Sequence, residues 1–359
     1  MERDISRIPQ TASVGAGGGR PGGGAGVGAS VGAGGGRPGG EALKVYAWRD
    51  GKTTETSEPD TIEALIADEQ TRLWIDLTDP SAALVDLISR SVGLHPLVAE
   101  DIIESNERAK VELVDDYIHI VMFALTRDQA TETHEVDFVL GKHFLLSVHP
   151  ASWDPLAAHQ IKMGITALLG RGPDFLLWAL VDGIVDGYFP VFDAFGDEID
   201  ALQDAVIGHA VPETLEHVFR LKRELIRIRH VVAPSREIFA QLTSRQFDLI
   251  SESQIFYFRD VYDHLIRLTD EFDSFRELVA GTLEVYLSTI NNNLAVIVKR
   301  LTGVTVVLAG IGAVGGIFGM SQATPALAGQ EGFGFYFMIL ALVLGAGIAI
   351  GVLRRIDWL

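Results

Sequence analysis

The sequence predicts an α+β domain with a mixed sheet and flanking helices, followed by a long helix and two C-terminal membrane-spanning helices. Strand-like alternation is concentrated in residues 43–149, and apolar residues at helical spacing follow from Asp174 onward. Residues 301–318 and 333–353 contain no charged side chain. Because a helix needs ~20 apolar residues to cross the hydrocarbon core, these two segments are expected to form a membrane hairpin.

The charge balance favours cationic partners. The chain has 359 residues and a formal net charge of −19, which disfavours nucleic acid and anionic ligands. A purely solubilising role for the acids is the simpler alternative. The absence of cysteine excludes disulfides and thiolate metal sites. The sequence contains no phosphate-binding loop, no paired nucleophile and base and no histidine-rich metal motif, so we expect a protein that is not an enzyme.

Residues 1–41 form a low-complexity segment that is rich in glycine. The run Ser-Val-Gly-Ala-Gly-Gly-Gly-Arg-Pro-Gly-Gly occurs at 13–23 and again at 30–40. Glycine at this density loses much chain entropy on ordering and buries little surface, so we expect a disordered tail. The first residues lack the apolar stretch of a secretory signal, and no cleavable signal peptide is expected.

Residues 42–155 are expected to form the α+β domain. Strands are predicted at 43–48, 73–77, 110–114, 117–125, 135–140 and 143–149, and short helices at 61–68 and 82–92. Asp79-Pro80-Ser81 supplies a helix start before 82–92, and Gly141-Lys142 is the clearest hairpin turn.

Residues 156–250 are expected to be helical, with helices over 174–202 and 213–242. A third helix begins near Glu252 and meets no proline before Pro325. Its apolar residues recur every three to four positions, which is typical of a coiled-coil seam. If it continues through the first span, as a stalk over 251–320, it would be about 100 Å long. A bundle of several shorter helices is the alternative.

The charges that flank the spans predict an orientation. Lys299 and Arg300 precede the first span, and Arg354 and Arg355 follow the second in the terminal segment 354–359. Glu331 is the only charge in the loop 321–332 that joins the spans. The positive-inside rule therefore places both termini in the cytoplasm, in a multi-pass protein of the plasma or inner cell membrane.

The first span carries a stripe of mostly small or weakly polar residues at a spacing of about 3.5. It consists of Val298, Leu301 or Thr302, Thr305, Ala309, Gly312, Gly316 and Gly319. Small residues at this spacing permit close helix packing in lipid, and they can equally line a pore. One hairpin cannot enclose a pore, so a pore would require several chains. Glu331, repeated around such an assembly, would form an acidic ring, although an ordinary loop acid is equally compatible with the sequence.

Several stretches in this order resemble the CorA family of divalent metal-ion channels. They are His95-Pro-Leu-Val-Ala-Glu-Asp101, Lys110-Val-Glu112, Gly141-Lys-His-Phe-Leu145, Phe258-Arg-Asp-Val-Tyr-Asp-His264, Leu283-Glu-Val-Tyr-Leu-Ser288, Lys299, Gly319-Met320 and Asp357-Trp358-Leu359. The resemblance covers residues 43–359, which is the whole chain apart from the glycine-rich tail.

The resemblance implies a homopentameric funnel whose stalk helix lines the pore, with the second span in an outer ring. It implies transport of Mg²⁺, and also of Co²⁺ or Ni²⁺, and closure by cytoplasmic Mg²⁺ bound between subunits. The matching regulatory positions are Glu100 and Asp101 on one subunit and Asp260 on the next, with Asp263 and His264 nearby. Asp182 and Asp186, one helical turn apart, could join this cluster, but ordinary surface acids are the favoured interpretation of that pair.

The sequence departs from the family at the pore. The family's Gly-Met-Asn signature becomes Gly319-Met320-Ser321, and the Ser321 hydroxyl is shorter than an asparagine side chain and has no carbonyl oxygen. We therefore keep two alternatives to a Mg²⁺ channel: a transporter of zinc or another divalent cation, and a membrane-anchored Mg²⁺-binding protein that does not conduct. Because Val298 and Ala309 are small, we expect Leu301 to form the narrow apolar gate.

Overall fold

The computed structural model describes residues 42–106, 108–128, 130–208, 211–244, 247–320 and 333–355. The glycine-rich tail, Ser321, Glu331 and the last four residues lie outside this part of the chain. Residues from Gly40 onward belong to one compact unit, and the description below concerns that unit alone.

The described strands form one seven-stranded sheet in the order β2-β1-β3-β7-β6-β5-β4. Their bounds are β1 Ala42–Arg49, β2 Lys52–Thr56, β3 Arg72–Thr78, β4 Lys110–Val114, β5 Tyr117–Arg127, β6 Thr131–Leu140 and β7 Phe144–His149. β3 and β7 pair in parallel and the other neighbours are antiparallel, so the predicted mixed sheet is confirmed. The sequence prediction missed β2 and the first residues of β6.

The turns of two hairpins, β1–β2 and β6–β7, have local causes. In the tight β1–β2 turn, Asp50 and Gly51 both have positive φ, 49° and 79°. Glycine adopts positive φ without steric strain, which explains its presence at position 51. In the β6–β7 turn, a Cβ added to Gly141 would lie 2.2 Å from the Phe144 ring. The close approach of that ring explains why this turn carries glycine.

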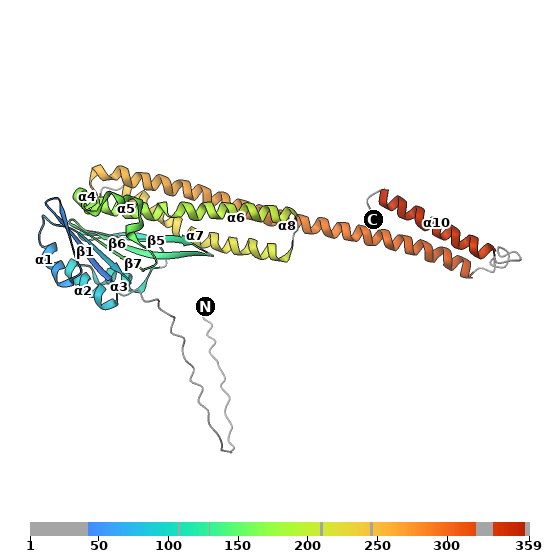
Figure 1. Cartoon of the computed structure of the whole chain (residues 1–359), viewed down its shortest axis with the longest axis horizontal. Coiled ribbons are helices and arrows are strands. Elements are labelled where there is room, and N and C mark those ends of the chain that lie inside the picture. The colour runs from blue at the N-terminus through green and yellow to red at the C-terminus, as the bar shows by residue number, and fades with distance from the viewer. Residues whose placement is uncertain are drawn as a thin grey trace, which may run out of the picture. The chain divides into compact units, whose positions relative to one another are not determined.

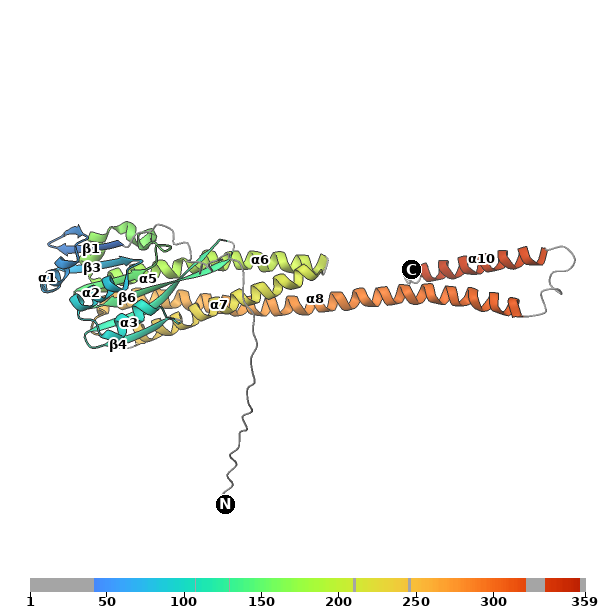
Figure 2. The same cartoon turned by 90° about the horizontal axis from the view of Figure 1, so that it is seen from below.

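Helices cover both faces of the sheet (Figures 1 and 2). One face packs against α1 Ile62–Ile66, α2 Ala82–Val92 and α3 Pro96–Glu104. Ser81 caps α2 by accepting the Leu84 N–H, as the sequence predicted. The other face packs against the remaining helices of the domain, and its core includes Trp74, Phe138 and Phe175.

The helices on the second face are α4 Ile165–Arg171, α5 Pro173–Asp186, α6 Tyr188–Gly208, α7 Pro212–Ser244 and the first half of α8. Short 3₁₀ helices at Pro155–Ala157 and His159–Met163 lead into them. The single helix predicted over 174–202 is wrong in one respect, because the chain divides at Gly187 into α5 and α6.

A partly buried ionic network attaches α6 and α7 to the sheet. Arg127, near the end of β5, pairs with Glu198 of α6 and lies 3.5 Å from a carboxylate oxygen of Glu224 on α7. His217 Nε2 lies 2.6 Å from Glu198, and the Arg127 guanidinium stacks 3.9 Å from the centre of the Phe195 ring. Three separate elements are therefore joined through one side chain.

Helix α8, Glu252–Met320, is continuous over 69 residues, so the alternative of several shorter helices is wrong. Its predicted seam is buried from Val261 through Leu265, Leu268, Phe272, Phe275 and Val279 to Tyr286, where it packs against α5, α6 and α7. Beyond Tyr286 the apolar side chains become exposed, and Ile297 is 60% exposed. The helix therefore leaves the domain core before it reaches the uncharged segment.

The uncharged part of α8 lies beside α10, Phe333–Arg355 (Figures 1 and 2). Two described helical stretches are long and apolar enough to cross a membrane, Glu252–Ile317 and Pro173–Ile207. The most apolar window of Pro173–Ile207 is 67% buried within the protein, whereas that of Glu252–Ile317 is 6% buried. Pro173–Ile207 is therefore a core segment, and α8 provides the exposed apolar surface that lipid or other subunits can cover.

Candidate metal sites

The sheet separates the two groups of acids that the sequence singled out. Glu100 and Asp101 lie on α3, which packs on one face of the sheet. Asp260, Asp263 and His264 lie on α8, which packs on the opposite face. Within one chain the sheet stands between the α3 and α8 groups, so they can meet only if two copies of the chain come together.

The structure does bring His264 of α8 together with Asp182 and Asp186 of α5. Candidate ligand atoms of these three residues lie within 4.8 Å of one another. The Gln160 amide donates a hydrogen bond to Asp182 and another, of 3.2 Å, to Asp186. Asp182 is only 6% exposed, so the interpretation of this pair as ordinary surface acids is wrong for Asp182.

Burial strongly perturbs the Asp182 carboxyl. Desolvation, followed by repulsion from Asp186, raises its pKa to about 6, and His264 opposes the shift. Asp260 also raises the pKa, so its charge acts on the same cluster. Three buried polar atoms at this place have no hydrogen-bond partner among the described residues: Gln160 Oε1, Asp182 Oδ1 and His264 Nδ1.

The donor set fits a hydrated divalent cation. Two carboxylates and an amide oxygen are the ligands that hard Mg²⁺ takes, directly or through its waters. An imidazole nitrogen can accept a hydrogen bond from such a water, and it can also bind transition metals directly. A bound cation would partner the orphaned atoms and relieve the repulsion between Asp182 and Asp186.

We expect cation binding at the α5–α8 cluster to weaken as the pH falls through 6. Protonation of Asp182 removes a ligand charge, so each pH unit below its pKa of about 6 should reduce the affinity by up to about tenfold. The raised pKa also means that the cation-free protein loses stability as pH rises from about 4 to 6, because the folded carboxyl resists ionisation. A cation removes that penalty, so added Mg²⁺ should raise the melting temperature more at pH 7.5 than at pH 5.

Thermal melts at both pH values, with and without Mg²⁺, test this expectation. In Asp182→Asn most of the pH dependence of the Mg²⁺ effect should disappear. Asp200→Asn, at an exposed α6 position, is the matched control and should behave as the wild type. An equal Mg²⁺ effect at pH 5 and pH 7.5 in the wild type would contradict the assignment.

A second cluster surrounds Asp101 on the other face of the sheet. Lys110 of β4 pairs with Asp101, and its Nζ lies 3.5 Å from Glu112 Oε2. His119 of β5 completes the group, with candidate ligand atoms of Asp101, Glu112 and His119 within 4.8 Å of one another. The His119 Nε2 atom lies 2.9 Å from Asp137 Oδ1, so this ring is also held from β6.

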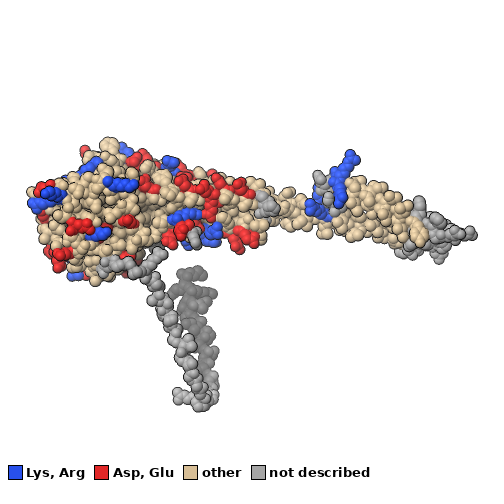
Figure 3. Space-filling model, in the orientation of Figure 1, with Lys and Arg blue, Asp and Glu red and all other residues tan. Residues whose placement is uncertain are grey.

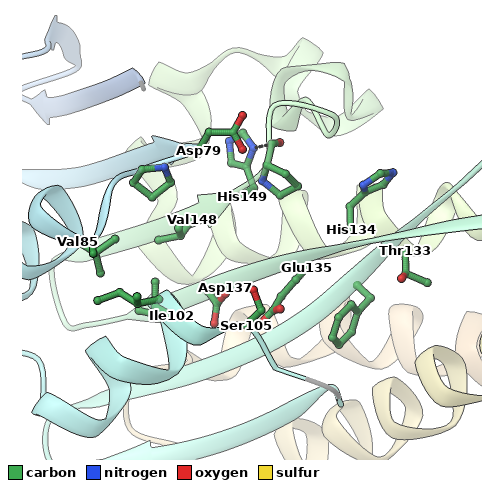
Figure 4. A pocket seen from close by; sticks show the side chains of 15 residues that line it. Asp79, Val85, Ile102, Ser105, Thr133, His134, Glu135, Asp137, Val148 and His149 are labelled. Carbon is green, nitrogen blue, oxygen red and sulfur yellow. Dashed lines mark hydrogen bonds between the residues drawn. The ribbon is translucent and has the colours of Figure 1, made fainter. Parts of the chain in front are cut away.

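A cavity of about 520 Å³ opens beside this cluster, at the carboxyl ends of β3 and β7 (Figure 4). Its buried acids and histidines are engaged with neighbouring groups. Both Glu135 oxygens accept hydrogen bonds from Asn106, and Asp137 is bonded to His119. His149 contacts the Pro150 carbonyl and Asp76. We therefore do not count the cavity among the metal sites.

The predicted stripe of the first span faces away from α10. Val298, Leu301, Thr305, Ala309, Gly312 and Gly316 are all exposed. On the opposite side of the helix, Gly303 is buried and Val307 is half-buried. A Cβ added at Gly312 or Gly316 would meet nothing within 4 Å, so the hairpin does not use these glycines for its own packing. Gly319 and Met320 lie at the end of α8, and their exposure lies outside what the structure describes.

Charges on the surface mark where the apolar segment begins (Figure 3). Acidic side chains gather on the helical part of the domain, and basic side chains lie between them and the uncharged segment. Lys299, Arg300, Arg354 and Arg355 are the only basic residues after Arg276. The antiparallel hairpin thus brings the two basic pairs to the same end of the spans.

The sequence did not predict that Gln160 joins the α5–α8 cluster, or that His119 and Lys110 join the cluster around Asp101. Gln160 lies in a short 3₁₀ helix that no periodicity signals, and its contact with α5 arises from tertiary packing. Lys110 and Glu112 alternate along a predicted strand, which does indicate a shared face. The register that sets Glu112 opposite His119 is fixed only when the strands pair.

Comparisons with known proteins agree with this architecture. A family model described as "CorA-like Mg2+ transporter protein" matches residues 69–355. The chain is 30% identical over 322 residues to the cobalt/magnesium transport protein CorA of Thermotoga maritima, which covers 87% of this chain and 89% of that protein.

Two solved structures have the same fold. The CorA magnesium transporter of Methanocaldococcus jannaschii superposes with a TM-score of 0.73 at 21% identity, over 89% of this chain and 99% of that one. The full-length CmaX protein superposes with a TM-score of 0.64 at 17% identity, over 90% of this chain and 100% of that one. At these identities the likeness supports the fold alone.

Proposed function

This chain belongs to the CorA family of Mg²⁺ transporters, and we propose that it is a channel for divalent cations, with Mg²⁺ as the preferred ion, that closes when cations bind to its cytoplasmic domain. One observation carries the proposal. A single uninterrupted helix, α8, holds Asp260 and His264 near one end and the uncharged stripe with Leu301 near the other. The two regions are about 55 Å apart along the helix.

A pore requires several copies of the chain. Two helices per chain cannot enclose an aqueous path, and a ring of α8 helices can. The stripe that faces away from α10 supports α8 as the lining helix and α10 as the outer one. We propose five copies, which is what the resemblance implies for the assembly.

Closure is proposed to depend on acids at the subunit interfaces. Asp101 on α3 and exposed Asp260 on α8 lie on opposite faces of one sheet and would approach each other across a boundary between copies. Glu100 and Asp263, both exposed, would add to the same negative surface. Without cations these acids repel, which favours separation of the subunits. A bound Mg²⁺ would supply the positive charge that holds them together.

The orientation follows from the basic residues. Lys299, Arg300, Arg354 and Arg355 lie at one end of the hairpin, and the positive-inside rule places that end in the cytoplasm. Both termini and the α+β domain would then be cytoplasmic. Cations that enter through the pore would raise the cytoplasmic cation concentration. Asp182, Asp186 and the interfacial acids would be exposed to that concentration.

Flux measurements on the full-length protein in liposomes test the proposal. With a Mg²⁺-sensitive dye inside, we expect rapid Mg²⁺ entry at low internal Mg²⁺ and slow entry when the cytoplasmic side is preloaded to millimolar levels. Asp101→Asn and Asp260→Asn should each weaken the suppression by preloaded Mg²⁺, while Asp200→Asn should not. Parallel assays with Zn²⁺ and Co²⁺ define the preferred ion. If none of the three ions entered the liposomes, the channel proposal would be wrong and the alternative of a non-conducting Mg²⁺-binding protein would be favoured.

A further inference from the structure

We propose that Lys110 is a tethered competitor for the regulatory cation, because its ammonium group occupies the Asp101 carboxylate that the cation needs. The inference rests on the proposed role of Asp101 in closing the channel. In the structure, Lys110 pairs with Asp101 and lies 3.5 Å from Glu112. An ammonium group between two carboxylates provides the charge that a metal ion would otherwise provide.

The surroundings make this a defined place for a cation. Asp101, Glu112 and His119 have candidate ligand atoms within 4.8 Å of one another. His119 is fully buried, and its Nδ1 atom has no hydrogen-bond partner among the described residues. Lys110 and Glu112 are two residues apart on β4, so their side chains lie on the same face of the sheet. The Lys110 ammonium group therefore reaches the acidic cluster from the same chain.

The backbone around Asp101 is anchored, so the competition concerns its side chain. Asn106, which follows α3, donates to the Asp101 carbonyl at 3.2 Å. The Asn106 backbone N–H and side-chain amide also donate to Glu135 of β6. The C-terminal end of α3 therefore stays attached to the sheet. The Asp101 carboxylate can either pair with Lys110 or turn outward to bind a cation at the subunit boundary.

The ion pair is accessible enough to exchange. The side chains of Lys110 and Asp101 are 27% and 38% exposed. Partly exposed ion pairs stabilise proteins only modestly, so the competition should change the apparent cation affinity by roughly three- to tenfold and should not abolish binding. Lys110 would thus set the internal Mg²⁺ concentration at which the channel closes, without being a metal ligand itself.

Calorimetric Mg²⁺ titration of the full-length protein in detergent tests the proposal. Lys110→Gln should lower the Mg²⁺ concentration at half-saturation by roughly three- to tenfold. Lys110→Arg, which keeps the charge, should stay near the wild type. Lys142→Gln is the matched control, since Lys142 is exposed and forms no ion pair within the described residues.

A double variant shows whether the effect passes through Asp101. In an Asp101→Asn background, Lys110→Gln should cause no further change. An unchanged or raised midpoint in Lys110→Gln, with a normal melting curve, would overturn the inference. Should Lys110→Gln fail to fold, a wild-type midpoint in Lys110→Met would overturn it equally. Absence of Mg²⁺ uptake in the wild type and in Lys110→Gln alike would overturn the inference together with the proposed regulation.

Discussion

Gly281→Pro is expected to uncouple the domain that holds the acidic clusters from the proposed pore. Gly281 lies in α8 between His264 and Leu301, within the stretch that joins the acidic cluster to the first span. Proline in a helix interior removes a backbone hydrogen bond, clashes with the preceding turn and costs ~3 kcal/mol or more. In Gly281→Pro, Mg²⁺ should still stabilise the domain that holds the acidic clusters against thermal unfolding, while preloaded Mg²⁺ should no longer slow Mg²⁺ entry into liposomes.

The same position provides its own control. A Cβ added to Gly281 would meet nothing within 4 Å, so the alanine methyl group has room at this position. Gly281→Ala keeps the backbone N–H and should stabilise the helix by ~0.5–1 kcal/mol with regulation intact. If Gly281→Pro responded to preloaded Mg²⁺ as Gly281→Ala does, continuity of α8 would not be the means of coupling.

Continuity of α8 was the part of the fold most open to prediction. Residues 252–280 contain neither glycine nor proline, and the apolar seam keeps one spacing throughout. The break between α5 and α6 was not predictable in the same way. Glycine within a helical pattern is often tolerated, and the sequence pattern does not distinguish Gly187, which ends α5, from Gly183, which lies inside it.

The candidate sites divide along similar lines. Glu100, Asp101 and Asp260 were identified from motifs, since each lies in a continuous stretch of sequence that resembles a family. The burial of Asp182 depends on α5, α8 and the Gln160 segment together, and an i, i+4 pair of acids looks the same in sequence whether it faces water or a core. Local patterns place a residue on an element, whereas its charge environment depends on distant segments.

The arrangement of the first span leads to the second large expected effect. Leu301 and the small residues after it lie on the exposed side of α8, away from α10. Leu301 is 65% exposed, and the Thr305 hydroxyl bonds to the Leu301 carbonyl at 2.8 Å, so that hydroxyl is already engaged along the helix. In a ring of α8 helices, Leu301 would be the bulkiest apolar side chain at this level. A ring of such side chains closes a pore by excluding water.

Leu301→Ala should therefore leave the pore open at internal Mg²⁺ levels that close the wild type. Removing three carbons from each copy takes away about 2 kcal/mol of apolar contact per side chain. That loss corresponds to a more than tenfold shift toward the open state. Mg²⁺ entry into preloaded liposomes should rise by about that factor, while Mg²⁺ binding measured by calorimetry should stay unchanged.

Ile317→Ala separates a gate from a general effect on membrane packing. Ile317 is 67% exposed, close to the value for Leu301, and lies sixteen residues further along α8. At 3.6 residues per turn this places it about 160° around the helix from Leu301. If a loosened membrane region alone caused the leak, both variants would leak equally. If only Leu301→Ala leaks, Leu301 forms the gate. If Leu301→Ala shows the wild-type rate of Mg²⁺ entry, the constriction lies at another level of the pore.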